Sequence, residues 1–227
     1  KPTAARNSRK PCRPRCRFRR GARELSKLRD HPHVVSVHEV GGLDGPLEYF
    51  VMEYLAGGDL YHALCGCRVA SERALEMLVD VARAAGVLHQ NGVVHRDICP
   101  ANILLTGDLV PKLGDFDLVR VDQSIGGATA TGQALGKLVY AAPEALRDGA
   151  TVTPAADVYS LGKTALFAAH GAELPDELAF IGLGPFINQL PCRAEVKAML
   201  TRALQPQAAQ RYATGAEFAE ALSAYGA

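Results

Sequence analysis

Two stretches of the sequence carry side chains that could act together on a substrate. The first is the run His95-Arg96-Asp97-Ile98-Cys99-Pro100-Ala101-Asn102, and the second is Asp115-Phe116-Asp117, which begins thirteen residues after Asn102. A carboxylate can accept a proton from a hydroxyl group, and carboxylate and amide oxygens are ligands that Mg²⁺ prefers. The two stretches therefore contain a candidate base and two candidate metal ligands.

The spacing of these stretches resembles the catalytic loop and the metal loop of protein kinases. The resemblance implies phosphoryl transfer from ATP with Mg²⁺, in which the enzyme mainly positions the acceptor hydroxyl and neutralises charge. It also implies that Asp97 is the base and that Asn102 and Asp115 are the magnesium ligands. Three further motifs follow in the family's order: Ala142-Pro143-Glu144, Asp157-Val158-Tyr159-Ser160-Leu161-Gly162 and Gln210-Arg211-Tyr212.

A hairpin would bring the two ligand candidates together. The short apolar run 103–105 and the run 110–113 flank the turn sequence Thr106-Gly107-Asp108, which predicts two antiparallel strands. Asn102 and Asp115 would then lie at the two ends of the hairpin, beside one nucleotide site.

The segment before the catalytic loop resembles part of a kinase N-lobe. Residues 21–29 have leucines on one helical face and resemble the end of the αC helix. Residues 34–40 and 47–54 predict two strands around a glycine-rich turn, and they match the last two strands of that lobe.

On this alignment four residues belong to the nucleotide site. The resemblance makes Met52 the gatekeeper, places Glu53 and Leu55 in the adenine hinge, and positions Asp59 to touch the ribose. The alternative is an ordinary buried strand followed by a solvated Asp59.

The later part of the chain predicts helices. Ser71 would cap a helix that runs up to Asn91, residues 157–169 form a helix apolar on most sides, and residues 192–204 and 214–225 form amphipathic helices. A helix apolar on most sides is buried, so Asp157 at its start would be costly unless it bonded backbone donors of the catalytic loop, as in the family. A plain N-cap is the alternative.

The resemblance assigns structural or regulatory roles to three more residues. Glu144 and Arg211 resemble a buried pair that links the activation segment to the late helices. Arg96 is placed to read a phosphate on that segment, or else it is a surface arginine.

Several positions depart from the family's pattern. The sequence has neither the Gly-rich loop nor the strand lysine that hold the ATP phosphates, and Cys99 replaces a lysine directed at the γ-phosphate. Asp117 replaces a glycine of the metal loop, and Lys137 replaces a threonine that reaches the base. Lys137 could lie against Asp97 or be solvated.

These departures leave two functional interpretations. The first is a Ser/Thr protein kinase domain that binds ATP weakly, transfers phosphate inefficiently and acts on a protein substrate. The alternative is a catalytically impaired pseudokinase that serves as a binding or scaffold module.

The composition limits which other classes of protein the chain could belong to. The 227 residues are 48% hydrophobic, enough for a full core, and no apolar run reaches the length of a membrane span. Residues 1–20 hold nine Lys or Arg and no acidic residue, and show no apolar periodicity. We expect this segment to be disordered. Its charge could bind nucleic acid through counterion release, but it lacks a recognition motif, so this third interpretation is the least favoured. Its composition and the missing initiator Met favour a fragment or a faulty gene model, and the default location is cytoplasmic.

The expected fold is therefore α+β, a two-lobed protein kinase fold with a mostly helical C-lobe and an incomplete β N-lobe. The boundaries are residues 1–20 for the disordered basic segment, 21–55 for the partial N-lobe with the hinge, and 56–227 for the C-lobe.

Overall fold

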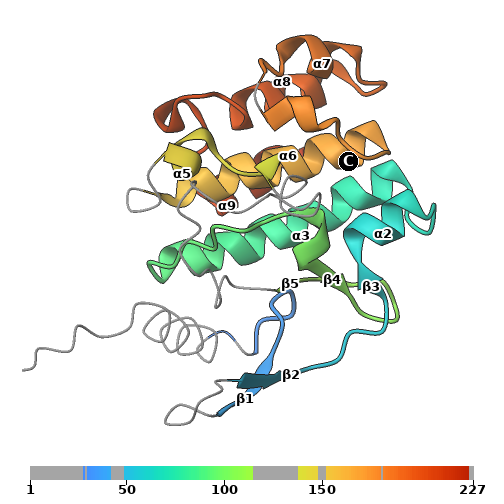
Figure 1. Ribbon diagram of the computed structural model, residues 1–227, viewed down its shortest axis with the longest axis vertical. Helices are drawn as coiled ribbons and strands as arrows, with labels where there is room; N and C mark the ends of the chain where they lie inside the picture. The colour runs from blue at the N-terminus through green and yellow to red at the C-terminus, as the bar shows by residue number, and fades with distance from the viewer. Residues whose placement is uncertain are drawn as a thin grey trace, which may run out of the picture.

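The chain has a mixed α+β structure that is mostly helical, which confirms the class expected from the sequence (Figure 1). This computed structural model describes residues 28, 30–41, 49–114, 138–147, 152–179 and 181–224. The expected disordered segment 1–20 and the expected helix end at residues 21–27 lie outside this part. The strands are β1 (Val37–Gly41), β2 (Tyr49–Met52), β3 (Gly58–Asp59), β4 (Ile103–Leu105) and β5 (Pro111–Leu113).

The helices form the larger part of the molecule. None of those in the described ranges is both long and apolar enough to cross a lipid bilayer. They are α2 (Leu60–Cys65), α3 (Ser71–Gln90), α5 (Pro143–Arg147), α6 (Pro154–His170), α7 (Gly184–Gln189), α8 (Ala194–Ala203) and α9 (Gly215–Ser223), with the short 3-10 helices η1 (Pro100–Asn102), η2 (Asp176–Ala179) and η3 (Ala208–Gln210).

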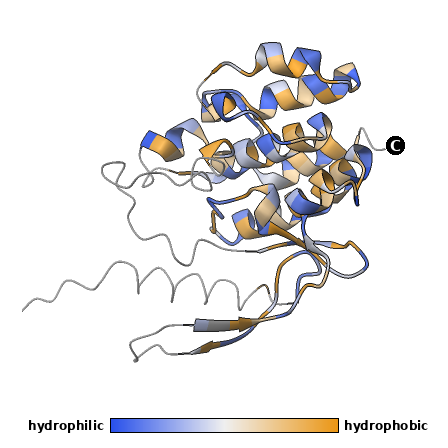
Figure 2. Cartoon of the chain, turned by 45° about the vertical axis from the view of Figure 1, so that its right-hand side comes forward, coloured by the Kyte–Doolittle hydropathy of each residue, from blue (hydrophilic) through white to orange (hydrophobic). Residues whose placement is uncertain are grey.

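Helix α6 is the centre of the helical part. All residues from Ala155 to Ala169 are buried, and α3 packs against both α6 and α9. Two glycines let α3 and α9 approach closely, because a Cβ on Gly86 would lie 2.8 Å from Ala216 N and one on Gly215 would lie 2.6 Å from Ala82 O. In Figure 2 the hydrophobic colour runs along these central helices, whereas β1 and β2 lie apart from them.

The start of α3 differs from the sequence-based prediction. Ala70 is the N-cap, with extended backbone at φ −74° and ψ 157°, and Ser71 is already the first helical residue. A hydroxyl side chain caps a helix only from the extended position, so the prediction of Ser71 as the cap is wrong. The pattern does hold at α9, where Thr214 Oγ1 accepts a hydrogen bond from Glu217 N at 3.3 Å.

The strands form two antiparallel sheets in the described residues. β1 pairs with β2, and β3, β4 and β5 form a second sheet in that order. The predicted hairpin is confirmed: Ile103 pairs with Leu113, and Leu105 pairs with Pro111. Residues 33–35 join the two sheets, because Val35 N donates to Leu113 O at 3.0 Å and Leu113 N donates to His33 O at 2.9 Å.

A lysine lies inside the central helix. The side chain of Lys163 in α6 is 0% exposed, its Nζ donates to Leu178 O at 2.6 Å, and it lies 5.8 Å from the centre of the Tyr159 ring. Burial lowers the pKa of Lys163 from 10.5 to about 8. Burial also raises the pKa of Tyr159 to about 12, so this neighbour stays neutral where Lys163 loses its proton.

We predict that Lys163 makes stability increase with pH between about 8 and 10.5. In this window the unfolded chain binds the lysine proton and the folded chain does not, so the free energy of unfolding rises with pH, by an amount of the order of 3 kcal/mol. Lys163→Met should remove this rise and be more stable than the parent at pH 7. Urea unfolding of both proteins at pH 7, 8, 9 and 10 measures the difference.

Lys197→Met is the matched control. Lys197 also donates to a backbone carbonyl, Asn188 O at 2.8 Å, but does so at the surface. Its variant should keep the pH dependence of the parent. An equal alkaline rise in the parent and in Lys163→Met would contradict the prediction.

Candidate active site

A buried carboxylate holds the candidate catalytic loop, residues 95–102. Asp157 is 0% exposed and accepts hydrogen bonds from His95 N at 2.7 Å, from Arg96 N at 2.7 Å and from His89 Nε2 at 2.9 Å. The structure thus contains the contact with backbone donors of the loop that the sequence predicts. Asp157 lies inside α6 after the cap at Thr153, so the alternative of a plain N-cap is wrong.

These hydrogen bonds fix an unusual backbone conformation at Arg96. Its φ is +72°, in the left-handed region that residues other than glycine rarely adopt. Such a conformation costs about 1–3 kcal/mol and persists only where surrounding contacts hold it. The Arg96 side chain itself is exposed, and residues 115–137 of the activation segment that it is expected to read lie outside the described residues.

His89 extends this network to a third helix, and sequence reasoning missed it. Gly215 N donates to His89 Nδ1 at 3.0 Å, so Nδ1 has no proton and the neutral ring carries its hydrogen on Nε2. That hydrogen is donated to Asp157 Oδ2. The side chain of one histidine therefore connects α3, α6 and the start of α9.

Asp97 and Asn102 lie in direct contact. Asn102 Nδ2 donates to Asp97 O at 2.7 Å and to Asp97 Oδ2 at 3.0 Å, and Asn102 is buried. Because the amide nitrogen is used in this way, the oxygen Oδ1 is the atom of Asn102 that remains for a cation. The ligand candidates are oxygen atoms, which suits a hard cation such as Mg²⁺.

The strand that leads to Asp115 is tied to the same loop. Gly114 N donates to Asn102 O at 2.9 Å, and His95 Nε2 donates to Gly114 O at 3.0 Å, since His95 Nδ1 accepts from Asp97 N at 3.3 Å. Gly114 therefore lies beside Asn102, as the hairpin predicts. Asp115, Asp117 and Lys137 lie outside the described residues.

The hinge candidates lie at the end of β2 and in the segment between β2 and β3. Met52 pairs with Val37 and is 46% exposed, Glu53 is partly buried, and Leu55 is partly exposed. Gly57 N then donates to Leu105 O at 2.9 Å, and a Cβ at Gly57 would lie 2.2 Å from Thr106 O. Only glycine fits this approach, which joins the hinge to the β3–β4–β5 sheet.

Asp59 is the N-cap of α2 and not simply a solvated residue. Its Oδ1 accepts from His62 N at 2.8 Å, and its Oδ2 lies 2.8 Å from His62 Nδ1. Asp59 also pairs with Leu104 across the sheet. Asp59 therefore belongs to the same sheet as the β4–β5 hairpin, which begins directly after Asn102.

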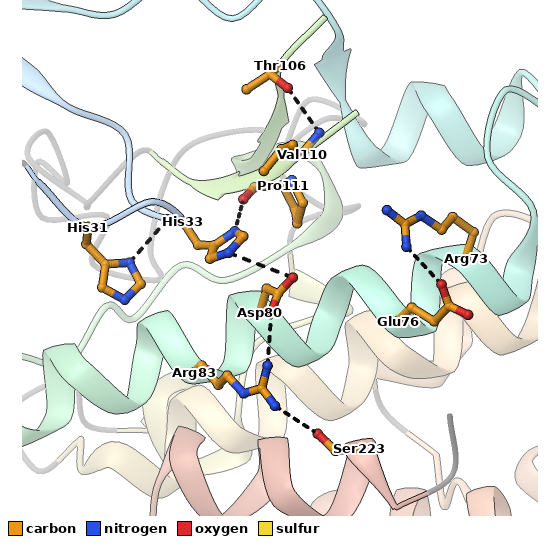
Figure 3. Close-up of polar contacts among 10 residues, drawn as sticks. All are labelled: His31, His33, Arg73, Glu76, Asp80, Arg83, Thr106, Val110, Pro111 and Ser223. Carbon is orange, nitrogen blue, oxygen red and sulfur yellow. Dashed lines mark hydrogen bonds and ion pairs between the residues drawn. The ribbon is translucent and has the colours of Figure 1, made fainter. Parts of the chain in front are cut away.

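A further polar chain fixes the outer edge of the hairpin (Figure 3). His33 Nδ1 donates to Pro111 O at 2.9 Å, and its Nε2 lies 3.8 Å from Asp80 on α3, which also pairs with Arg83 at 3.2 Å. His31 Nδ1 accepts from His33 N at 3.2 Å, and burial together with the nearby His33 lowers the pKa of His31. The segment before β1 is thus attached to both β5 and α3.

Glu144 and Arg211 form the pair that the sequence predicts. Arg211 donates from NH1 to Glu144 Oε1 at 2.7 Å and from NH2 to Oε2 at 2.9 Å, and its side chain is 0% exposed. Burial alone would raise the pKa of Glu144, but the hydrogen bonds and charge of Arg211 hold it below its usual range. Arg211 also donates to Ala155 O at 2.9 Å, which connects the pair to α6.

Comparison with known proteins identifies relatives over most of the chain. Residues 5–177 match the family described as protein tyrosine and serine/threonine kinase, a match that begins within the basic segment 1–20. The chain is 35% identical over 229 residues to serine/threonine-protein kinase PknJ of Mycobacterium tuberculosis, and 36% identical over 218 residues to PknK of that species. It is 34% identical over 223 residues to PknB of Mycolicibacterium smegmatis.

These alignments cover 92%, 91% and 88% of this chain but 38%, 19% and 34% of the three relatives. The chain therefore spans well under half the length of the curated relatives that it matches.

We predict that Arg211→Ala destabilises the fold strongly. The change leaves the partly buried Glu144 carboxylate and three backbone carbonyls, those of Ala155, Gln205 and Pro206, without their donor. Loss of one partner of a fully buried pair costs about 3–5 kcal/mol, which is the upper bound here. Arg73→Ala is the control, because Arg73 pairs with Glu76 at 2.9 Å on the exposed face of α3. It should cost less than about 1 kcal/mol. Chemical denaturation of the three proteins tests this, and equal midpoints for Arg211→Ala and the parent would refute it.

Proposed function

Because the chain belongs to the protein kinase family, we propose that it is a Ser/Thr protein kinase domain that transfers a phosphoryl group from Mg-ATP to a hydroxyl group of a protein. The contact between Asp97 and Asn102, inside a loop held by Asp157, is the observation that carries the proposal. The similarity to mycobacterial serine/threonine kinases supports the Ser/Thr assignment.

In this mechanism the chain positions the reacting groups. Asp97 accepts the proton of the substrate hydroxyl, and the hydrogen bond from Asn102 Nδ2 orients its carboxylate. Asn102 Oδ1 and the Asp115 carboxylate would hold Mg²⁺, which supplies positive charge to the phosphate oxygens. Gly114, the last described residue before Asp115 in the sequence, is bonded to both Asn102 and His95.

The nucleotide base would bind at the hinge, with Met52 as gatekeeper and Asp59 near the ribose. Glu53 N donates to Ser36 O at 3.0 Å, and the Glu53 carboxylate is bonded to Lys112. The backbone carbonyl is thus the group of Glu53 that remains for the base, next to the backbone of Leu55. We also propose that residues 21–55 and 56–227 correspond to the two kinase lobes.

A pseudokinase remains the second candidate, and specific residues favour it. Cys99 is buried among apolar side chains where the family has a cationic lysine, so this loop position supplies no charge to the phosphates. Asp117 and Lys137 replace a glycine and a threonine of the family pattern. In this case the chain binds ATP or a partner protein without turnover.

We expect Asp97→Asn to lower kcat for phosphoryl transfer by about 10²–10⁴-fold, because the amide cannot accept the hydroxyl proton. Transfer of labelled phosphate from ATP to a generic protein substrate measures this, with and without EDTA. Asp108→Asn changes an exposed turn carboxylate and should behave as the parent. Transfer that withstands both Asp97→Asn and EDTA would contradict the mechanism.

The same protein preparations distinguish a pseudokinase from an active kinase. ATP that raises the unfolding midpoint, with no phosphate transferred by the parent, indicates binding without catalysis. Ligand at 100 times its Kd stabilises the folded state by about 2.7 kcal/mol, so the shift is measurable.

A further inference from the structure

One ion pair joins the hinge to the strand that leads to the metal loop. Lys112 Nζ lies 2.7 Å from Glu53 Oε1 and 2.9 Å from Glu53 Oε2, so the ammonium group contacts both oxygens of the carboxylate. The side chains are 15% and 23% exposed, respectively. Glu53 follows β2 directly, and Lys112 is the middle residue of β5.

Glu53 also binds the segment that precedes β1. Ser36 N donates to Glu53 Oε1 at 2.7 Å, and Glu53 N donates to Ser36 O at 3.0 Å. Burial alone would raise the pKa of Glu53, but the hydrogen bonds from Lys112 and Ser36 outweigh burial and hold it below its usual range. The carboxylate is therefore an ionised junction of three segments that are distant in sequence.

The strand register shows what this junction positions. Asp59 pairs with Leu104, and Leu104 pairs with Lys112, so the three residues form one row across the β3–β4–β5 sheet. Directly paired residues point to the same face of a sheet. The side chains of this row are partly exposed, whereas the neighbouring Ile103, Leu105 and Leu113 are buried.

The hinge has few other described contacts with the rest of the chain. Tyr54, next to Glu53, is 90% exposed, and β1 and β2 lie apart from the helices (Figures 1 and 2). The backbone links of the hinge are Glu53 N to Ser36 O, where the neighbouring Val35 N bonds Leu113 O in β5, and Gly57 N to Leu105 O. The Lys112–Glu53 pair adds a direct side-chain link from the hinge to the row that contains Asp59 and Leu104.

We propose that Lys112 is a positioning residue for nucleotide binding, which fixes the hinge to the sheet that carries Asp59 and leads to Asp115. The inference rests on the proposed function. Lys112 acts through Glu53 and not on the phosphates, because both carboxylate oxygens already neutralise its charge. The pair holds the hinge in the binding position before ATP arrives, so its loss weakens binding.

Loss of the Lys112–Glu53 pair should therefore change KM for ATP and leave kcat nearly unchanged. We expect Lys112→Met to raise KM for ATP roughly fivefold, equivalent to about 1 kcal/mol, with kcat within about twofold of the parent. Glu53→Gln should have a similar effect, and the double variant should be no worse than either single one, since both remove the same contact. Lys112→Arg keeps the charge and should restore KM.

Lys197→Met is the control for loss of one lysine, because Lys197 lies far along the chain on α8 and bonds a surface carbonyl. Thermal unfolding of the four-protein cycle without nucleotide tests the contact itself: Lys112→Met and Glu53→Gln should be non-additive. Additive effects, a KM equal to that of Lys197→Met, or a loss confined to kcat would each overturn the inference.

The design separates this inference from the proposed function. ATP-induced shifts of the unfolding midpoint give Kd for each variant even if the parent transfers no phosphate. If Lys112→Met binds ATP as tightly as the parent does, the inference is overturned and the proposed function is not affected. If the parent transfers no phosphate but binds ATP more tightly than Lys112→Met does, the enzymatic function is overturned and the inference is supported. A parent that binds no ATP overturns both.

Discussion

The arrangement of the site depends on the buried carboxylate of Asp157. An ionised group inside a protein is costly unless hydrogen bonds replace its water, and three donors from two other segments do so here. Two of the donors are consecutive backbone N–H groups of the catalytic loop, which can converge on one carboxylate because Arg96 adopts a left-handed conformation. The burial of α6 therefore determines the shape of the loop, and the shape of the loop determines where Asp97 points.

Further hydrogen bonds fix the conformation of residues 95–102 more than once. His95 donates its backbone N–H to Asp157 and its ring hydrogen to Gly114 O, so one residue links the central helix to the end of the hairpin. Asn102 bonds Asp97 through its side chain and Gly114 through its backbone. Both His89 and His95 are held as neutral rings with the hydrogen on Nε2, because a backbone N–H occupies each Nδ1. Loss of any single bond leaves others in place.

The sequence predicts those features that periodicity and motif order determine. The hairpin at β4 and β5, the burial of α6 and the Glu144–Arg211 pair follow from apolar patterning and from the family's motifs. The sequence does not predict contacts between side chains that are distant along the chain. The role of Lys112 becomes visible only when β5 is placed beside the hinge. The burial of Lys163 was not predicted, because the helix that contains it is apolar on average. The cap of α3 was missed because Ala70, and not Ser71, takes the extended backbone. The predictions for Asp115, Asp117 and Lys137 stay predictions, since these residues lie outside the described part.

The two halves of the site differ in how firmly the described contacts hold them. The catalytic loop is embedded in a buried network that spans α3, α6 and α9, whereas the hinge is attached by a partly exposed ion pair, a reciprocal pair with Ser36 and the close approach of Gly57. Partly exposed ion pairs contribute less and respond to salt, because solvent screens them. The geometry of Asp97 and Asn102 should consequently survive changes that shift the hinge. Under the proposed function, nucleotide affinity is therefore the property that sequence change or ionic strength can alter without disturbing residues 95–102.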